Sequence, residues 1–170
     1  TIIELVKKIV LNACGVKSLG GLKLFLESFD FFSKTDSKIF VLYSEIEFYK
    51  DLNNQFYENP RVKFYKTTNK RYLHPFLNYF LPNKIVEEIN NSDAIIHFGN
   101  FGFKTLKKSF VLIQNILPLV KRGIRNSILK VLINRSMTFS NFILIQLDHL
   151  KEDIDKKFHS KIIQIGKTTS

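Results

Sequence analysis

The sequence predicts an α/β fold: a doubly wound, mostly parallel, Rossmann-like sheet covered by helices on both faces. Short apolar runs alternate along the chain with segments of helical periodicity, which is the pattern of strand–helix–strand units. Several of these runs, such as IFVL at 39–42, are almost wholly apolar, as strands buried on both faces are. The chain of 170 residues is long enough for one domain with a real core.

Seven strands are expected from runs rich in Ile, Val and Phe. They lie at 7–13, 38–43, 61–65, 94–98, 109–113, 141–146 and 161–165. Five helices are expected where apolar residues recur every three or four positions. They lie at 21–33, 46–57, 71–90, 120–137 and 147–156. Turn signals separate the elements, for example Asn59-Pro60 before one strand and the glycine loop 99–102 after another.

The composition excludes several classes of site. Cys14 is the single cysteine, so no internal disulfide forms, and a reducing compartment is the simplest setting. The four histidines show no metal-ligand spacing, so we expect no metal site. No apolar run reaches the roughly 20 residues of a membrane span. The sequence also has no nucleophile-elbow motif, no strand-end carboxylate pair suited to glycoside hydrolysis and no nucleic-acid readout motif.

Positive charge is concentrated in one part of the chain. The net charge is +11, yet no acidic residue occurs between Asp93 and Asp148. The same interval holds the basic residues Lys104, Lys107, Lys108, Lys121, Arg122, Arg125, Lys130 and Arg135. A one-sided basic region attracts phosphate groups, whether in nucleic acid, in anionic lipid or in a nucleotide. The alternative is a solvated basic surface that only keeps the protein soluble.

Polar or glycine residues follow several of the expected strands, and ligands of open α/β sheets bind at these carboxyl ends. They are Ser18, Gly20 and Gly21 after the first strand, Ser44 after the second, Lys66 and Thr67 after the third, His97, Gly99 and Asn100 at the fourth, and Gln114 and Asn115 after the fifth. Gly20-Gly21 opens a helix, where accessible amides bind phosphate; alternatively, the pair only turns the chain. His97 is the candidate acid, base or oxyanion partner, with a hydrogen-bonded structural histidine as the alternative. Asn115 either belongs to the site or caps the turn that leads to Pro118.

Two segments are candidates for contact with a membrane. In segment 121–135, one helix face carries Ile124, Ile128, Val131 and Leu132. We expect this face to pack on the sheet, and the cations of the segment to contact anions. The cations that we assign to this contact are Lys121, Arg122 and Arg125. Segment 70–84 is aromatic with basic ends, which suits either the lipid headgroup level or a helix that covers the sheet.

An ordered set of passages carries a family resemblance. Gly20-Gly21-Leu22 ends the first loop and starts a helix, and DAIIHFGNFG at 93–102 is a strand that ends near histidine and small residues. LIQNILPLV at 112–120 is a strand followed by an Asn-x-x-Pro turn, and KIIQIG at 161–166 is a strand that ends in glycine. Over nearly the whole chain, these passages resemble the N-terminal domain of GT-B glycosyltransferases of the family 4 type.

The resemblance implies that residues 1–170 form one Rossmann-like domain, the acceptor-side half of a two-domain enzyme, inactive without its C-terminal, donor-binding domain. Such an enzyme moves a sugar from a nucleotide-sugar donor to a glycan or lipid-linked acceptor, with retention and without an obligatory metal or other cofactor. By the resemblance, the roles are donor-phosphate contact for Gly20 and Gly21, catalysis beside the reacting sugar for His97, and acceptor binding for Ser18, Asn100 and Asn115. The basic interval is then expected to hold a cytoplasmic protein peripherally against the anionic inner face of the cell membrane.

Two other functions remain open from the sequence. One is a standalone Rossmann-like module that binds a nucleotide or phosphosugar; it predicts tight binding of nucleoside diphosphates by this chain alone. The other is a nucleic-acid-binding domain that uses charge alone; it predicts sequence-indifferent binding that salt weakens steeply.

Overall fold

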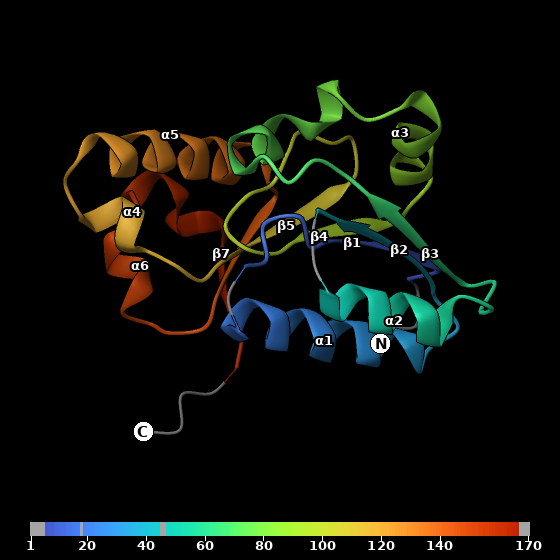
Figure 1. Cartoon of the computed structure of the whole chain (residues 1–170). Helices are drawn as coiled ribbons and strands as arrows, with labels where there is room; N and C mark the ends of the chain where they lie inside the picture. Colours follow the sequence, from blue (N-terminus) through green and yellow to red (C-terminus); the bar gives the residue numbers. More distant parts are fainter. Residues whose placement is uncertain (1–5, 18, 45–46, 167–170) are drawn as a thin grey trace.

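In the computed structural model, seven strands form one parallel sheet between two layers of helices (Figure 1). The structure describes residues 6–17, 19–44 and 47–166, and the elements named here lie within them. The strands are β1 (Lys8–Asn12), β2 (Lys38–Tyr43), β3 (Val62–Lys66), β4 (Ala94–His97), β5 (Lys108–Ile113), β6 (Phe142–Ile145) and β7 (Ile162–Gln164). Their order is β3-β2-β1-β4-β5-β6-β7, and all neighbours are parallel. The predicted doubly wound, Rossmann-like α/β fold is confirmed.

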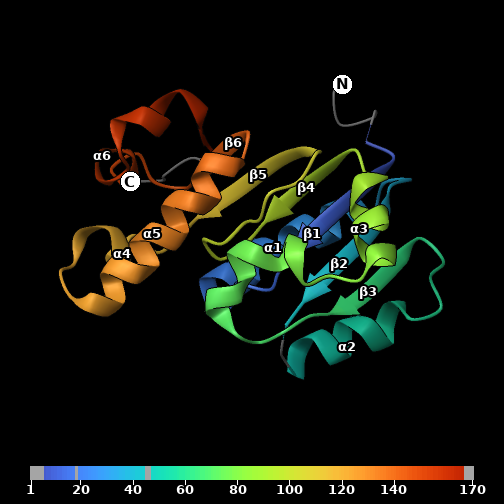
Figure 2. The same cartoon turned by 90° about the horizontal axis from the view of Figure 1, so that it is seen from above.

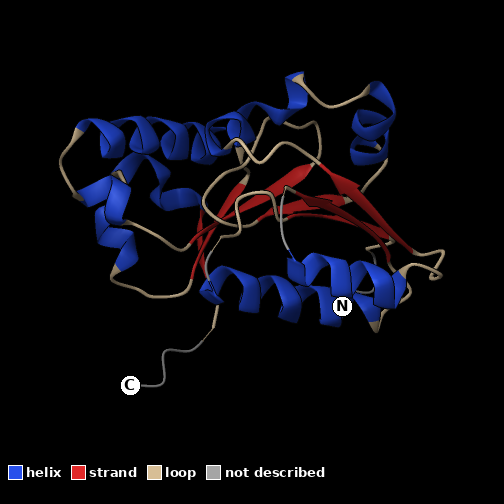
Figure 3. Ribbon diagram, viewed as in Figure 1, coloured by secondary structure: helices blue, strands red, loops and turns tan. Residues whose placement is uncertain are grey.

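Helices cover both faces of the sheet, as Figures 1 and 3 show. On one face lie α1 (Leu19–Ser33) and α2 (Glu47–Phe56); on the other lie the 3₁₀ helix η2 (Arg71–Tyr79), α3 (Asn83–Asn90) and α5 (Ile124–Phe139). The short pieces are α4 (Leu117–Val120), α6 (Leu150–Asp153) and the 3₁₀ helix η3 (Lys156–Lys161). This two-sided cover explains why the strands are apolar at consecutive positions.

The core lies on both sides of the sheet. Along β1, Leu11 packs with the α1 and α2 side, whereas its neighbour Val10 packs with the η2 and α3 side. On the α1 side, the Phe25 ring lies 5.2 Å from Tyr49 and 5.6 Å from Phe98, both in edge-to-face geometry. Such aromatic pairs add to the free energy gained by burial. The α1 helix is therefore locked to both α2 and the loop after β4.

Three of the five expected helices differ from the structure. The expected helix 71–90 is two pieces, because Pro75 removes a backbone donor and Pro82 is held in an extended conformation (ψ 147°). The expected helix 120–137 divides at Gly123, whose φ of 127° is incompatible with a continuous helix. Within the expected helix 147–156, only Leu150–Asp153 is α-helical.

Candidate functional site

The direction in which the chain adds strands to the sheet reverses between β1 and β4. The chain moves outward from β1 through β2 to β3, then returns to pair β4 with β1 on its other side. Asn12 and His97, the last residues of β1 and β4, are register partners. In doubly wound sheets this switch point is where ligands bind.

Two glycines hold the loops after β1 and β4 in direct backbone contact. A Cβ on Gly15 would lie 2.8 Å from the carbonyl oxygens of Phe98 and Gly99. A Cβ on Gly99 would lie 2.3 Å from the carbonyl carbon and oxygen of Gly15, and Gly99 also has a φ of 78°. Neither position accepts a side chain, so the glycines set the spacing of the two loops at the switch point.

His97 is fully buried and is held by Asn12. The side-chain nitrogen of Asn12 lies 2.8 Å from Nδ1 of His97, while Oδ1 of Asn12 accepts from the Cys14 amide at 3.2 Å. Asn12 therefore donates to Nδ1, which places the imidazole proton on Nε2. Nε2 has no hydrogen-bond partner among the described residues. Burial lowers the pKa of His97 to about 3, so the ring is neutral at pH 7.

The hydrogen bond from Asn12 and the close packing of Gly102 limit the catalytic roles that His97 can have. Nδ1 is engaged by Asn12, and Gly102 lies so close that a Cβ there would be 2.7 Å from Cδ2 of the ring. A neutral ring with a protonated Nε2 is a hydrogen-bond donor rather than a proton acceptor. The geometry thus favours an oxyanion partner or a structural histidine over a general base.

Asn100 and Asn115 join the loops after β4 and β5. Oδ1 of Asn100 accepts from the amides of Gln114 (2.7 Å) and Asn115 (3.2 Å), and its Nδ2 donates to the Asn115 carbonyl (2.6 Å). Oδ1 of Asn115 accepts from the Leu117 amide at 3.0 Å, which makes Asn115 the cap of the turn into α4. Both residues thus lie at the carboxyl edge, where Asn100, 1% exposed, braces two loops.

Replacing Asn100 with alanine is expected to lower the free energy of unfolding by roughly 1–3 kcal/mol, since the partly buried amides of Gln114 and Asn115 lose their acceptor. Asn100 also has a φ of 72°. Alanine is strained at this φ, whereas glycine adopts it without strain. Urea denaturation of Asn100→Ala and Asn100→Gly separates the loss of the hydrogen bonds from the backbone strain. Both variants lose the hydrogen bonds, but only the alanine variant is strained, so the free energy of unfolding is expected to fall less in the glycine variant. Equal stability of the parent and both variants would contradict this role.

The glycine pair lies in the first turn of α1. Gly20 is exposed and a Cβ there would meet no atom within 4 Å, so packing does not require glycine at this position. Gly21 is buried. Ser18, the remaining predicted residue of this loop, lies outside the described residues.

Three cations come from different connections near this edge, and sequence reasoning missed two of them. Burial lowers the pKa of the Arg71 guanidinium in η2, and the nearby positive charge of Arg125 in α5 lowers it further. Arg71 also stacks over Phe101, 5.0 Å from the ring centroid, and its buried Nε has no partner among the described residues. Lys17, which follows β1, lies near the fully buried His74. No salt bridge within the described residues neutralises Lys17, Arg71 or Arg125.

His74 was not singled out by the sequence, because a histidine within an expected covering helix carries no distinctive spacing. Its Nε2 lies 3.1 Å from the Thr68 carbonyl and donates to it, which leaves Nδ1 as an acceptor without a partner among the described residues. Burial, and to a lesser degree the neighbouring Lys17 and Arg71, lower its pKa to about 4. At neutral pH the ring adds no charge to the cations around it.

The expected packing of the α5 apolar face on the sheet is wrong for three of its four residues. Ile124 is 84% exposed, Ile128 48% and Val131 65%, whereas Leu132 is buried. The sheet is instead covered by the opposite side of the helix, which carries Leu129, Leu132, Ile133 and Met137. Lys121, Arg122 and Arg125 are exposed, as expected of anion contacts.

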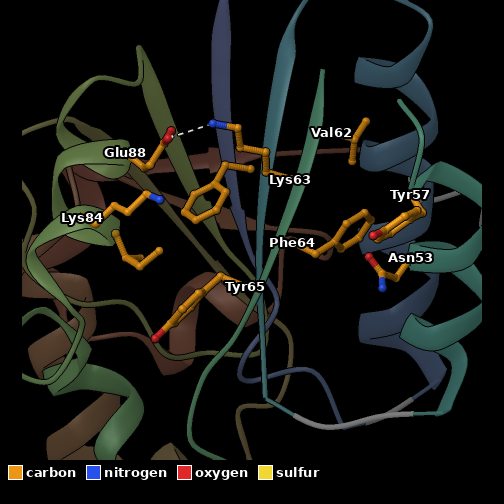
Figure 4. Close-up of a pocket in the computed structure, with 10 residues that line it drawn as sticks. Asn53, Tyr57, Val62, Lys63, Phe64, Tyr65, Lys84 and Glu88 are labelled. Atoms are coloured by element: carbon orange, nitrogen blue, oxygen red, sulfur yellow. Dashed lines mark hydrogen bonds and ion pairs between the residues drawn. The ribbon is translucent and has the colours of Figure 1, made fainter. Parts of the chain in front are cut away.

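A pocket of about 370 Å³ lies away from the carboxyl edge, between the outer strand β3 and helices α2 and α3 (Figure 4). Its carboxylate, Glu88, accepts from Nζ of Lys63 at 2.9 Å and from Nζ of Lys8 at 2.5 Å. These two hydrogen bonds lower the pKa of Glu88 to about 2, and the one from Lys8 makes the larger contribution. Because its charge is already satisfied, Glu88 ties α3 to β1 and β3 and is not a candidate acid or base.

The described residues contain no group of three or more His, Cys, Asp or Glu side chains that could hold a metal ion. None of the helices in the described ranges has the length and apolar character needed to cross a bilayer.

Comparison with protein-family models finds no match to this chain, and comparison with curated proteins finds none either. Among solved structures, the chain is similar to the crystal structure of LpCGTa in complex with UDP, with a TM-score of 0.52 and 11% sequence identity. The match covers 97% of this chain and 53% of the LpCGTa chain. The chain therefore has a fold that occurs in a UDP-binding protein and spans about half of that protein's length.

Proposed function

We infer that this chain is the acceptor-side domain of a retaining GT-B glycosyltransferase, which moves a sugar from a nucleotide-sugar donor to a glycan or lipid-linked acceptor. The observation that carries the proposal is the fold shared with LpCGTa, whose structure holds UDP. UDP is the product that a transferase releases when its donor is a UDP-sugar. The partial coverage of LpCGTa fits a second, donor-binding domain that completes the enzyme.

The switch point supplies groups that suit such a reaction. Gly20 is exposed in the first turn of α1, where backbone amides and the helix dipole favour a phosphate oxygen. In the proposal, the Gly20-Gly21 turn lies beside the donor phosphates and the exposed Gly20 contacts them, while Asn100 and Asn115 shape the acceptor site by holding the loops after β4 and β5. Ser18 stays a candidate for acceptor binding from its place in the sequence alone, because it lies outside the described residues.

His97 is proposed to act beside the reacting sugar as a neutral donor. Its protonated Nε2 is buried without a partner among the described residues, so it has a hydrogen bond to offer an oxygen that gains negative charge. The ring is 0% exposed and packs against Gly102 and Phe103, so a ligand reaches Nε2 only after the residues around the ring rearrange.

The negative charge of a nucleoside diphosphate must be balanced by a metal ion or by basic side chains. Lys17 and Arg71 come from the connections after β1 and β3, and neither is paired with an acid among the described residues. We therefore assign the charge balance to these cations and expect transfer without an obligatory metal.

The proposal is tested on the native polypeptide that carries this chain. We expect this polypeptide to be about twice as long as the present chain, as two Rossmann-like domains require, and mass spectrometry measures its length. Consumption of UDP- and GDP-sugars is then measured, with lipid extract or glycan as acceptor. Gly20→Ala is expected to lower the rate roughly tenfold, because a methyl group would intrude on a diphosphate that approaches the backbone. The matched control is Asn54→Ala, also to alanine at an exposed helical site, in α2.

Thermal melting shows whether a lower transfer rate of the Gly20→Ala variant comes from a loss of stability. Gly20→Ala is expected to leave the folded state as stable as the parent or slightly more so, since alanine favours a helix. Micromolar or tighter UDP binding by residues 1–170 alone would instead support a standalone nucleotide-binding module. Absence of transfer from every donor by a polypeptide that includes both domains would overturn the proposal.

A further inference from the structure

Helix α5 has two apolar sides, and only one of them is explained by folding. Leu129, Ile133 and Met137 are buried against the sheet. Ile124, Ile128 and Val131 lie on the opposite side and are 84%, 48% and 65% exposed. Their spacing of four and three residues places them in one row along the helix. Exposed apolar residues that gather on one helix face in this way favour an interaction site.

The cations around this row are equally unexplained by the folded chain. Lys121, Arg122 and Arg125 lie at or just before the first turn of α5, which has no acidic residue. Positive charge at a helix N-terminus opposes the helix dipole and lowers stability slightly. No described acid pairs with any of the three. An external anion would make these positions more favourable.

The surface continues across the neighbouring η2, which packs beside α5 (Figures 1 and 2). Tyr72, next to Arg71 in the first turn of η2, is 48% exposed. Arg71 of η2 lies near enough to Arg125 of α5 for the two charges to repel, so positive charge extends from α5 to η2. Aromatic side chains next to cations are typical of the headgroup level of a bilayer.

We propose that the exposed faces of α4, α5 and η2 form a docking surface for an anionic lipid bilayer. The row Ile124, Ile128 and Val131 enters the boundary between headgroups and acyl chains, and Lys121, Arg122 and Arg125 contact lipid phosphates. The purpose of this contact, access to a lipid-linked acceptor, rests on the proposed function. The binding itself is measured without any sugar transfer, so the two proposals fail separately.

Charge and shape favour a bilayer over other partners. A second copy that docked through the same surface would place these cations against each other in a symmetric dimer. A nucleic-acid backbone would satisfy the cations but leave the apolar row without a partner, since sequence-independent binding uses phosphate contacts. A bilayer of anionic lipid satisfies both sets of side chains.

Co-sedimentation with vesicles tests the proposal. The chain is expected to bind vesicles of 70% phosphatidylcholine and 30% phosphatidylglycerol, and to bind pure phosphatidylcholine weakly. Lys121→Glu/Arg122→Glu/Arg125→Glu is expected to lower the partition coefficient by at least roughly 100-fold, at about fivefold for each lost cation. The charge-matched control, Lys23→Glu/Lys38→Glu/Lys50→Glu, alters exposed lysines on α1, β2 and α2 and is expected to keep binding within a fewfold of the parent.

The apolar row has its own test. Ile124→Ser/Ile128→Ser/Val131→Ser is expected to lower binding at least tenfold without lowering the melting temperature, because these side chains contact solvent in the free protein. Leu26→Ser/Phe31→Ser/Tyr57→Ser, at exposed positions on the α1 and α2 side, is the matched control. Binding that survives both substitutions on α5, or a charge variant that loses only RNA or DNA binding, would overturn the proposal. A concentration-dependent dimer abolished by the serine variant would also overturn it.

Discussion

Gly99→Ala is expected to prevent the chain from reaching its native fold, or to lower the free energy of unfolding by more than roughly 4 kcal/mol. The new Cβ would lie 2.3 Å from the carbonyl carbon and oxygen of Gly15, which is backbone and cannot rotate away. The φ of 78° adds strain for any residue with a side chain. Gly15→Ala meets carbonyl oxygens at 2.8 Å and is expected to be nearly as harmful. Expression level, circular dichroism and urea denaturation measure both effects.

Gly20→Ala is the matched control for this prediction. It makes the same chemical change in a nearby glycine where a Cβ would meet no atom within 4 Å. In the first turn of α1, alanine is expected to keep or raise stability by up to about 1 kcal/mol. If Gly99→Ala unfolded within 1 kcal/mol of Gly20→Ala, the contact between the loops after β1 and β4 would be contradicted.

Acidification from pH 6.5 to 4.5 is expected to lower the free energy of unfolding by roughly 5 kcal/mol. The unfolded histidines take up protons below their ordinary pKa of 6.5, but folded His97 and His74 do so only at about pH 3 and about pH 4. Stability is therefore complete above pH 6.5 and falls as the pH drops, by about 1.4 kcal/mol per pH unit for each histidine. A loss of this size is comparable to the whole stability of a small domain.

Urea denaturation at half-unit pH intervals checks this expectation. The window ends at pH 4.5 because carboxylates, including the ion-paired Glu88, contribute below it. His97→Gln and His74→Gln are each expected to be less stable than the parent at pH 7, yet each should roughly halve the slope of stability against pH. The double variant should nearly abolish the slope. A parent curve that is flat between pH 6.5 and 4.5 would show that the two rings are not buried in solution.

The strands were predictable because they depend on local patterns. Consecutive apolar residues, such as those of β2 and β6, have no polar face to show to water, so both faces must be covered and the sheet must be parallel. Helices were harder to delimit. In segment 71–90 the apolar spacing was helical, but Pro75 and Pro82 removed the hydrogen bonds that a single helix would need.

The candidate site was predictable only as a location. Polar residues after β1, β4 and β5 gather at one edge because parallel strands end there together. The pairing of His97 with Asn12 joins residues 85 positions apart, and Asn12 lies inside a strand that the sequence marks only as apolar. The cations Lys17 and Arg71 were missed in the same way, since each lies in a different connection.

The strands, their parallel direction and the edge at which polar groups collect follow from local properties, namely apolar runs and chain direction. The pairing of the groups at that edge, and the side of α5 that meets solvent, depend on contacts between distant parts of the chain. Apolar residues occupy both sides of that helix, at 124, 128 and 131 and at 129, 133 and 137, so its periodicity allows two orientations. The choice depends on which row fits the surface of β5 and β6, and that fit exists only once the sheet has formed.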